Sequence, residues 1–176
     1  MNVEVVCTTE DPIDSLDHHV KIRNSNYSVK VSTAFRPDKA IMISSDTYLD
    51  YLDKLSEVSN VSIDSYKSLC DALNLRLDYF EENGCTLSDH GLSYVPFRTF
   101  TDSEIEIIFQ KRTTKKQLSL EEDEKFQSSL LLFLCEQYHK RDWIQQFHLG
   151  ALRNNNARMN RVLGPDTGWD SIGDYS

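Results

Sequence analysis

The chain has 176 residues, of which 39% are hydrophobic and 27% are charged, values that are ordinary for a globular protein. Its formal net charge of -9 argues against nucleic acid as a partner, because binding to a phosphate backbone needs clustered lysine and arginine. A membrane partner is not expected either, since no hydrophobic amino-terminal signal is present and no apolar run approaches the roughly 20 residues that span a bilayer.

The cysteines indicate the cellular compartment. Cys7, Cys70, Cys85 and Cys135 are far apart in the sequence and form no CxxC pair. Each lies in an apolar pattern, where a free thiol usually behaves as a small buried hydrophobic group. We therefore predict buried thiols in a protein of the reducing cytoplasm.

The first part of the chain predicts two short strands that both end in charge. The first strand starts at residue 3 and leads into the polar residues 8–11. A short helix through Lys21 follows, and a second strand covers residues 29–35 and ends at residues 36–38.

Two helices are expected next, at residues 46–59 and 66–82, because apolar residues recur there at helical spacing. The second helix should end at Asn83-Gly84, a pair that suits a left-handed cap. A third short strand at residues 85–88 then leads into Asp89-His90-Gly91. The expected buried stripes are Leu49, Leu52, Leu55 and Val58 in the first helix and Tyr66, Leu69, Leu73, Leu77 and Phe80 in the second.

Two capping boxes mark the starts of the following helices. Thr101 with Glu104, and Ser119 with Glu122, have the spacing at which each side chain bonds to the backbone of the other residue. A fourth strand is predicted at residues 144–149. The helix after Ser119 should bury the stripe Phe126, Leu130, Leu131, Leu134 and Tyr138.

The order of these elements predicts the fold class. Strands that alternate with helices favour a parallel α/β sheet with helical crossovers over an antiparallel sandwich. Four such units amount to about half of an eight-stranded barrel, although the alternation alone also permits a small open α/β sheet. We expect residues 1–176 to form a single domain of the partial-barrel kind.

The richest polar stretch follows the fourth strand. His148 ends that strand, where barrel enzymes carry their sites, and an imidazole can move protons, bind a metal or simply be structural. Arg153 offers a forked positive charge that suits a substrate carboxylate. Asn154 and Asn155, with Asn156, suit a polyhydroxylated sugar; the competing interpretation is that an asparagine run ties down a turn.

Polar residues near the ends of earlier strands are further candidates. Arg36 could bind an anion, or it could simply pair with Asp38. Asp89 and His90 have the chemistry of an oriented acid or base, or they fasten the loop before Gly91.

Two other polar clusters are weaker candidates. Thr9, Glu10 and Asp11 follow the first strand, but Asp-Pro at positions 11 and 12 is also typical of helix entry. His18 and His19 lie in a predicted exposed helix, where adjacent side chains point about 100° apart. We therefore expect a surface pair and not joint metal ligands.

Several segments together carry a family resemblance. They are WIQQFHLGALRNNNARM at 143–159, LGPDTGWDSIGD at 163–174, VVCTTEDPIDSL at 5–16, AFRPDKA at 34–40 and NGCTLSDHGL at 83–92. In this order they resemble the uronate isomerases of the amidohydrolase superfamily. The resemblance implies a partial (β/α)8 TIM barrel of the metal-dependent amidohydrolase type. Because the family's upstream HxH and distal aspartate ligands are absent, it also implies an internal segment of a longer enzyme.

The resemblance implies a reaction as well. D-glucuronate would be isomerised to D-fructuronate, and D-galacturonate to D-tagaturonate, with a divalent metal that we expect to be zinc and with His148 as one ligand. The expected catalytic residues are His148, His90 and Asp89, and the expected substrate-binding residues are Arg153, Arg36, Asn154 and Asn155.

Two other interpretations stay open. The first is a metal-dependent hydrolase of the same superfamily, and the second is a truncated product without catalysis. For the leading interpretation, the 176-residue chain alone is expected to be inactive, and homo-oligomerisation is an open expectation for the longer enzyme.

Overall fold

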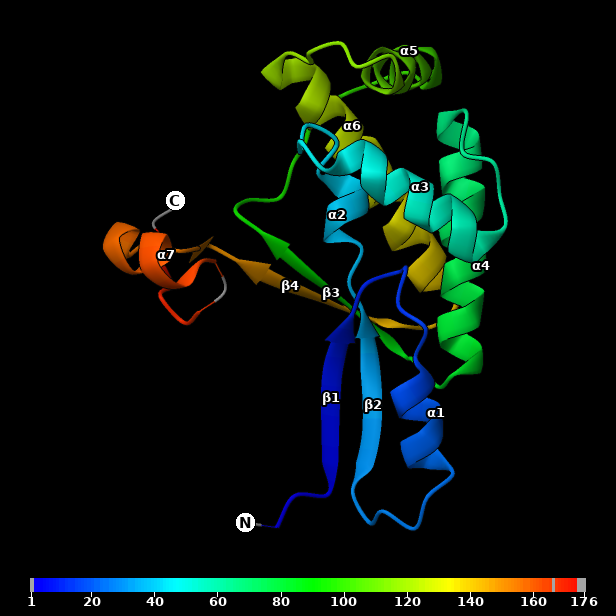
Figure 1. Cartoon of the computed structure of the whole chain (residues 1–176). Helices are drawn as coiled ribbons and strands as arrows, with labels where there is room; N and C mark the ends of the chain where they lie inside the picture. Colours follow the sequence, from blue (N-terminus) through cyan, green and yellow to red (C-terminus); the bar gives the residue numbers. More distant parts are fainter. Residues whose placement is uncertain (1, 166, 174–176) are drawn as a thin grey trace.

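The computed structural model describes residues 2–165 and 167–173, and its centre is a sheet of four parallel strands (Figure 1). In the sheet the strands stand in chain order: β1 (Val5–Glu10), β2 (Lys30–Phe35), β3 (Leu87–Leu92) and β4 (Ile144–Leu149). Helices connect each strand to the next. The predicted parallel α/β class with helical crossovers is confirmed.

The helices gather on one side of this sheet, as Figure 1 shows. They are α1 (Asp17–Arg23), α2 (Asp38–Ile41), α3 (Tyr48–Ser59), α4 (Tyr66–Glu82), α5 (Asp102–Thr113) and α6 (Leu120–Lys140). A separate lobe beyond β4 contains the antiparallel strands β5 (Ala151–Leu152) and β6 (Ser171–Ile172) with α7 (Ala157–Leu163). Within residues 2–165 and 167–173, no helix is long and apolar enough to cross a membrane.

The two middle strands meet where the sheet changes direction. β1 pairs with β2, and β3 with β4, along their whole lengths. Between β2 and β3, Phe35 lies opposite Ser88, and the two strand pairs cross near this point (Figure 1). Because the strands are parallel, the next residues along them, Arg36 and Asp89, emerge side by side.

The core lies between the sheet and the helices. Phe35 is completely buried; its ring meets the edge of Phe80 at 5.0 Å between centroids and lies 6.2 Å from Trp143. Tyr138 of α6 stacks on Trp143 at 6.0 Å. The buried leucines around them are Leu69, Leu73, Leu77, Leu130 and Leu134. Truncation of such a side chain to alanine typically costs about 2–5 kcal/mol, so this cluster fixes the position of the strands.

The helix starts follow the predicted caps. The Thr101 hydroxyl accepts the backbone N–H of Glu104, whose side chain accepts the backbone N–H of Thr101. Ser119 and Glu122 make the same reciprocal pair at the start of α6. Both predicted capping boxes are therefore confirmed.

The third strand is longer than predicted. The sequence placed it at residues 85–88, with Asp89-His90-Gly91 in a loop, but β3 extends to Leu92 and contains all three residues. Asp89 is opposite Gln146, and Gly91 is opposite His148. The ladder to β4 holds this polar segment extended, although its composition is typical of a turn.

Several local predictions are wrong. Val58 is 40% exposed, and the buried stripe of α3 instead includes Tyr48 and Tyr51. Cys7 is exposed because β1 is an edge strand in the described sheet, and among the other cysteines only Cys85 is fully buried. His19 is not on the surface: its side chain is 11% exposed and its Nε2 lies 2.7 Å from the Thr8 hydroxyl. The short helix α2 and the small β5–β6 sheet were not predicted.

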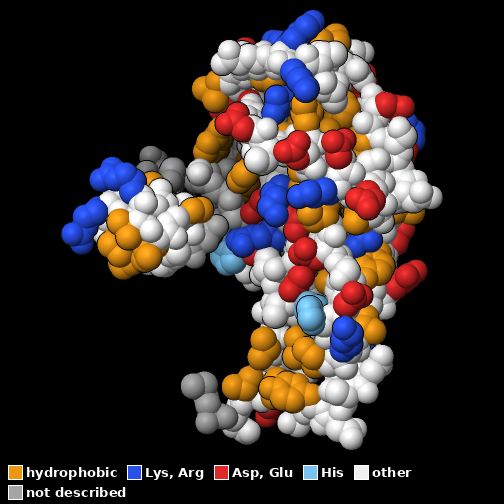
Figure 2. Space-filling model, viewed as in Figure 1, with side chains coloured by type: hydrophobic (Ala, Val, Ile, Leu, Met, Phe, Trp, Pro, Cys, Tyr) orange, Lys and Arg blue, Asp and Glu red, His pale blue; other side chains and the backbone are white. Residues whose placement is uncertain are grey.

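The sheet leaves apolar side chains in solvent at both of its edges. Val5 on β1 is 58% exposed, and Ile144 on β4 is 69% exposed. Figure 2 shows further hydrophobic side chains over the amino ends of β1 and β2 and on the lobe that contains α7. In a closed barrel such strand edges are paired.

Candidate functional site

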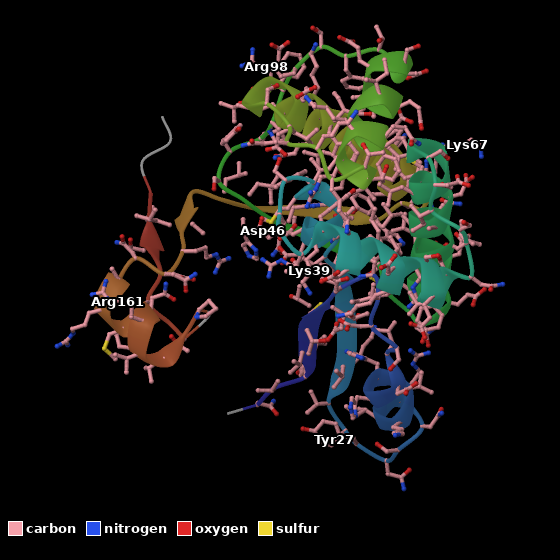
Figure 3. The ribbon with its side chains drawn as sticks, turned by 45° about the horizontal axis from the view of Figure 1, so that its top comes forward. Tyr27, Lys39, Asp46, Lys67, Arg98 and Arg161 are labelled. Atoms are coloured by element: carbon pink, nitrogen blue, oxygen red, sulfur yellow. The ribbon has the colours of Figure 1, made fainter. Side chains whose placement is uncertain are left out.

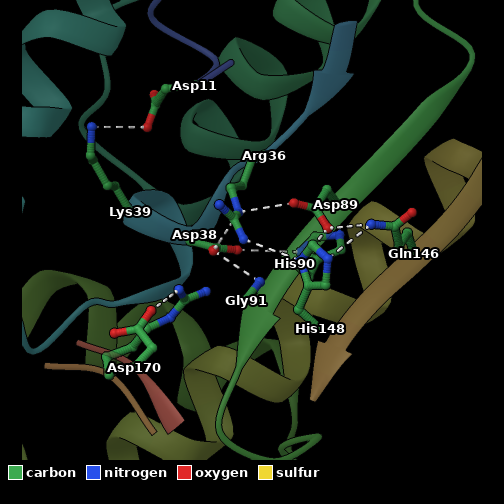
Figure 4. A network of polar contacts seen from close by, with 11 residues as sticks. Asp11, Arg36, Asp38, Lys39, Asp89, His90, Gly91, Gln146, His148 and Asp170 are labelled. Atoms are coloured by element: carbon green, nitrogen blue, oxygen red, sulfur yellow. Dashed lines mark hydrogen bonds and ion pairs between the residues drawn. The ribbon is translucent and has the colours of Figure 1, made fainter. Parts of the chain in front are cut away.

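The carboxyl ends of the parallel strands bring together polar residues that are far apart in the sequence. Arg36 directly follows β2, Asp89 lies within β3, and His148 lies near the end of β4. Figure 4 shows their side chains meeting in one network with Gln146. These three candidates from different strands therefore lie together at one edge of the sheet.

Alternation along the strands decides which residues join the network. Neighbouring residues of a strand point to opposite faces, so Asp89 and Gly91 share one face and His90 points to the other. On β4, Gln146 and His148 likewise share a face. The predicted Asp89-His90 pair is therefore split: Asp89 faces the site, and the His90 ring lies in the core.

Asp89 is the centre of the network. Its side chain is only 2% exposed, and its Oδ2 lies 3.2 Å from the Arg36 Nε. Its Oδ1 lies 2.8 Å from the His148 Nδ1 and accepts a hydrogen bond from the Gln146 side-chain amide at 3.1 Å. A buried carboxylate is stable only with such partners, and here a cation and two hydrogen-bonding groups surround it.

The contacts of His148 indicate its tautomer. A hydrogen on Nδ1 would point to Asp89, which leaves the lone pair of Nε2 to accept from the Gln146 Nε2 at 3.1 Å. Arg36 Nη2 lies 3.3 Å from Nδ1. The side chain of His148 is 48% exposed, and a ligand that binds Nε2 would have to replace the hydrogen bond from Gln146. A carboxylate behind the other ring nitrogen is the usual support of a metal-binding histidine.

His90 is a buried neighbour of this network and not an exposed member of it. The residue has no exposed surface, and its ring stacks on Phe147 at 5.4 Å and packs on Tyr138 at 5.6 Å. Burial, with a smaller contribution from Arg36, lowers the pKa of His90 to about 4. The ring is therefore neutral at physiological pH, and its Nδ1 lies 3.8 Å from the Asp38 Oδ1.

Arg153 joins the site from the lobe beyond β4. Its Nη1 donates to Asp170 Oδ2 at 2.6 Å, and the Arg153 side chain remains 49% exposed. Its Nη2 lies 3.7 Å from the position that a Cβ on Gly91 would occupy. The guanidinium therefore reaches the same strand tip as Arg36 while it is anchored from the other side.

The asparagines mainly build the lobe itself. The backbone N–H of Asn154 donates to Asp170, and Asn155 binds the Trp169 carbonyl through its N–H and Ser171 through its side chain. Asn156 caps α7. These contacts match the turn-forming interpretation of the asparagine run. Figure 3 shows Arg161 of α7 in this lobe, well apart from Lys39 near the sheet.

The polar cluster at the carboxyl end of β1 is held by structural contacts. Glu10 accepts hydrogen bonds from the hydroxyls of Thr8 and Thr33 and lies 3.5 Å from the His19 Nε2. Asp11 accepts the N–H of Ile13 and pairs with Lys39 at 3.3 Å. Burial raises the pKa of Asp11. This cluster braces the entry to α1 beside the network in Figure 4.

Sequence reasoning missed two participants. Gln146 bridges Asp89 and His148, and its signal is its place two residues before His148 on a strand, hence on the same face. Asp170 anchors Arg153 from 17 residues away, and no local pattern indicates that contact. Residues 163–174 form one of the segments that carry the family resemblance, and two of them, residues 166 and 174, lie outside the described residues.

The residues present fit a metal ion only in part. His148 Nε2 is a nitrogen donor on a half-exposed ring with a carboxylate behind it, although Gln146 occupies its lone pair in this structure. Among the residues that the structure describes, no group of three or more histidine, cysteine, aspartate or glutamate side chains could hold a metal ion. A metal ion bound to His148 would therefore need ligands other than these residues.

Comparisons with known proteins agree on one family. The family model described as glucuronate isomerase matches residues 1–176. A uronate isomerase of Flavobacterium johnsoniae is 59% identical over 175 residues, which cover 99% of this chain and 38% of that protein. One of Cellvibrio japonicus is 48% identical over 177 residues and is likewise covered to 38%. The chain thus spans 38% of the length of these curated relatives.

Solved structures show the same similarity in three dimensions. The uronate isomerase of Thermotoga maritima has a TM-score of 0.92 and 26% identity, with 98% of this chain and 38% of that one covered. The glucuronate isomerase of Caulobacter crescentus has a TM-score of 0.86 and 31% identity, with 98% and 36% covered. The four parallel strands therefore have the arrangement of part of a TIM-barrel isomerase.

Proposed function

Because the chain belongs to the glucuronate isomerase family, we propose that residues 1–176 supply one part of a (β/α)8 barrel that isomerises uronate sugars in the cytoplasm. The proposed reactions convert D-glucuronate to D-fructuronate and D-galacturonate to D-tagaturonate. The observation that carries the proposal is the Arg36–Asp89–His148 cluster at the strand ends. Since the chain spans 38% of its relatives, we propose that turnover needs further barrel strands.

The chemistry that the site must perform is a proton transfer between two neighbouring carbons. A base removes the proton from C2 of the open-chain aldose, and a hydroxyl proton moves from O2 to O1, which gives an enediolate with its negative charge on O2. Return of a proton to C1 gives the ketose, so the atoms balance without any oxidant or reductant.

Asp89 and His148 are the proposed groups for this proton transfer. Asp89 is shielded from water and in contact with His148, so a proton can be held between the carboxylate and the ring. Gln146 fixes both partners through its amide group. His90, which the sequence suggested as catalytic, is instead proposed to be a positioning residue. Its neutral ring packs in the core on the face of β3 opposite Asp89.

Arg153 and Arg36 are the proposed binding groups for the sugar acid. A guanidinium forms paired, charge-assisted hydrogen bonds with a carboxylate, and these two approach one strand tip from opposite sides. The side chains of Asn154 and Asn155 lie next to Arg153 in the chain and are proposed to contact sugar hydroxyls. This arrangement favours a substrate with a terminal carboxylate over a neutral sugar.

A divalent metal ion, proposed to be zinc, would polarise the carbonyl and hydroxyl oxygens of the bound sugar. His148 Nε2 is proposed as one of its ligands and would then give up its hydrogen bond from Gln146. The carboxylate of Asp89 would hold the His148 ring in the tautomer that presents this nitrogen. Homo-oligomerisation of the complete enzyme also remains a proposal.

The decisive experiment uses a chimera in which this chain replaces the matching segment of the F. johnsoniae uronate isomerase. The 59% identity makes such an exchange structurally conservative. We expect the purified chimera to convert D-glucuronate to D-fructuronate, as detected by product analysis, and the 176-residue chain alone to form no ketose.

Two results would contradict the proposal. A folded chimera that yields no ketose would show that these residues do not support isomerisation, and a hydrolysis product would favour a metal-dependent hydrolase. Ketose formed by the isolated chain would refute the need for further strands.

A further inference from the structure

Arg36 is held by two carboxylates that have different neighbours. Its Nε lies 3.2 Å from Asp89 Oδ2 and 3.3 Å from Asp38 Oδ2. Asp89 also contacts His148, at the centre of the proposed chemistry. Asp38 instead contacts the backbone of β3, where its Oδ2 accepts the Gly91 N–H at 3.0 Å. Asp89 therefore anchors Arg36 on the side of the proposed proton transfer. Asp38 anchors it on the other side, called the scaffold side here, where the backbone of β3 holds Asp38.

Asp38, the scaffold-side anchor, is largely buried and is held by several contacts. Asp38 is the first residue of α2, directly after Pro37, and its side chain is only 16% exposed. Its Oδ1 faces the Nδ1 of His90 at 3.8 Å. Burial raises the pKa of Asp38, while the Gly91 N–H and Arg36 partly oppose that rise. The carboxylate is thus fixed by the backbone of one element and the start of another.

Position 91 favours a glycine, because any other residue would place a Cβ close to Arg36 and Asp38. A Cβ at position 91 would lie 3.0 Å from Arg36 Nη2 and 3.1 Å from Asp38 Oδ2, distances shorter than ordinary carbon contacts. It would also lie 3.7 Å from Arg153 Nη2. A side chain at this position would therefore force the ends of Arg36 and Asp38 to shift by a few tenths of an ångström.

We propose that Asp38 and Gly91 are positioning residues for substrate binding: Gly91 provides the space and the N–H that fix Asp38, and Asp38 fixes the guanidinium of Arg36. The inference rests on the proposed function, in which Arg36 binds the sugar acid. An arginine side chain has many rotamers, and a fixed guanidinium binds its ligand without the cost of ordering it. Asp89 is then free to serve the proton transfer while Arg36 stays in place.

The kinetic test uses the chimera with Asp38→Asn and, separately, Gly91→Ala. Asparagine keeps the size of the side chain but removes the charge that holds Arg36. We expect the KM for D-glucuronate to rise roughly tenfold in each variant with a much smaller change in kcat, because substrate binding loses a preorganised charge-assisted contact. The double variant should be little worse than either single one, because both changes disrupt the same contact.

The matched control is Asp71→Asn. Asp71 lies on α4, where it pairs with exposed Lys67 at 2.5 Å, far from the strand ends, and its removal should leave both constants unchanged. Unchanged KM in Asp38→Asn and Gly91→Ala would overturn the proposal. Equal losses of kcat with unchanged KM would also overturn it.

A second measurement does not depend on activity. In the isotope-labelled 176-residue chain, the Nε–H signal of Arg36, whose Nε lies between the two carboxylates, should shift and broaden in Asp38→Asn and in Gly91→Ala. An unchanged signal would refute the positioning role. If the unmodified chimera forms no ketose, the proposed function fails, and this signal still tests the Asp38–Arg36 contact on its own.

Discussion

Arg153 is the residue whose role can be separated most clearly from its structural surroundings. It is half exposed and anchored by Asp170, so its loss leaves no cavity in the core. We predict that Arg153→Ala in the chimera raises the KM for D-glucuronate by roughly ten- to a hundredfold, the typical cost of a lost charge-assisted pair. Steady-state kinetics with glucuronate measure this effect.

The matched control for that change is Arg161→Ala. Arg161 is an exposed arginine on α7, and Figure 3 shows it in the lobe beyond β4, well apart from Lys39. It should leave KM within about twofold of the unmodified chimera. Equal effects of the two substitutions would mean that Arg153 does not contact the substrate.

His90 makes the stability of the chain depend on pH. Its pKa is lowered from 6.5 to about 4 by burial, with Arg36, Asp38, Tyr138 and Phe147 around the ring. The unfolded chain therefore binds a proton more tightly than the folded chain, so stability is full above pH 6.5 and falls as the pH decreases toward 4. We predict a loss of about 2 kcal/mol between pH 7 and pH 5 from this residue.

Urea denaturation of the 176-residue chain at the two pH values measures that loss. His90→Phe keeps an aromatic ring against Phe147 and cannot be protonated, so most of the pH dependence in this range should disappear. A variant with the same pH dependence as the unmodified chain would show that another group is responsible.

At the scale of single residues, the sequence indicates which side chains have suitable chemistry better than it indicates the face of the sheet to which each side chain points. Arg36, Asp89, His148 and Arg153 were all candidates, and they do lie together. His90 was placed with them because it follows Asp89, although adjacent residues of a strand face opposite sides. The face to which His90 points depends on the length of β3. The polar composition of residues 89–91 does not indicate that the strand extends through them.

The helices show where local signals are sufficient. Capping boxes at Thr101 and Ser119 act within one turn, so their spacing predicts the helix starts. β3 shows the opposite case, because its extension to Leu92 comes from the ladder to β4, which is distant in the sequence. The short α2 and the β5–β6 pair likewise depend on contacts that no local pattern reports.

The cap of α6 gives a prediction for an element as a whole. The Ser119 hydroxyl accepts the N–H of Glu122, so Ser119→Ala leaves that donor without its partner. We predict a loss of about 1 kcal/mol in the free energy of unfolding, measured by urea denaturation. Ser103→Ala, at an exposed position within α5, should change it by no more than a few tenths. Equal effects would contradict a capping contribution.

At the scale of the whole molecule, the sequence predicts the class of the fold and a family model matches the entire chain. The local patterns of the sequence do not predict how the sheet closes into a barrel, because closure pairs strands from distant parts of a polypeptide. In the described sheet, β1 and β4 are the edge strands. Both edge strands carry exposed apolar side chains, among them Val5 and Ile144.

These edges give a prediction about association. Val5 on β1 and Ile144 on β4 are both more than half exposed, and unpaired apolar edge strands readily pair with another chain. We predict that the isolated 176-residue chain self-associates at roughly 10–100 μM, as measured by sedimentation velocity. A lysine on an edge strand opposes such pairing, so the double variant Val5→Lys and Ile144→Lys should sediment as a monomer over the same range.

Leu75→Lys is the matched control for this experiment, because Leu75 is 48% exposed but lies on α4 and not on a strand edge. It should associate like the unmodified chain if backbone pairing at the edges causes association. An equal reduction by Leu75→Lys would instead attribute association to general surface hydrophobicity. In the chimera the edges should be covered by neighbouring strands, so the edge lysines should impair its folding while Leu75→Lys does not.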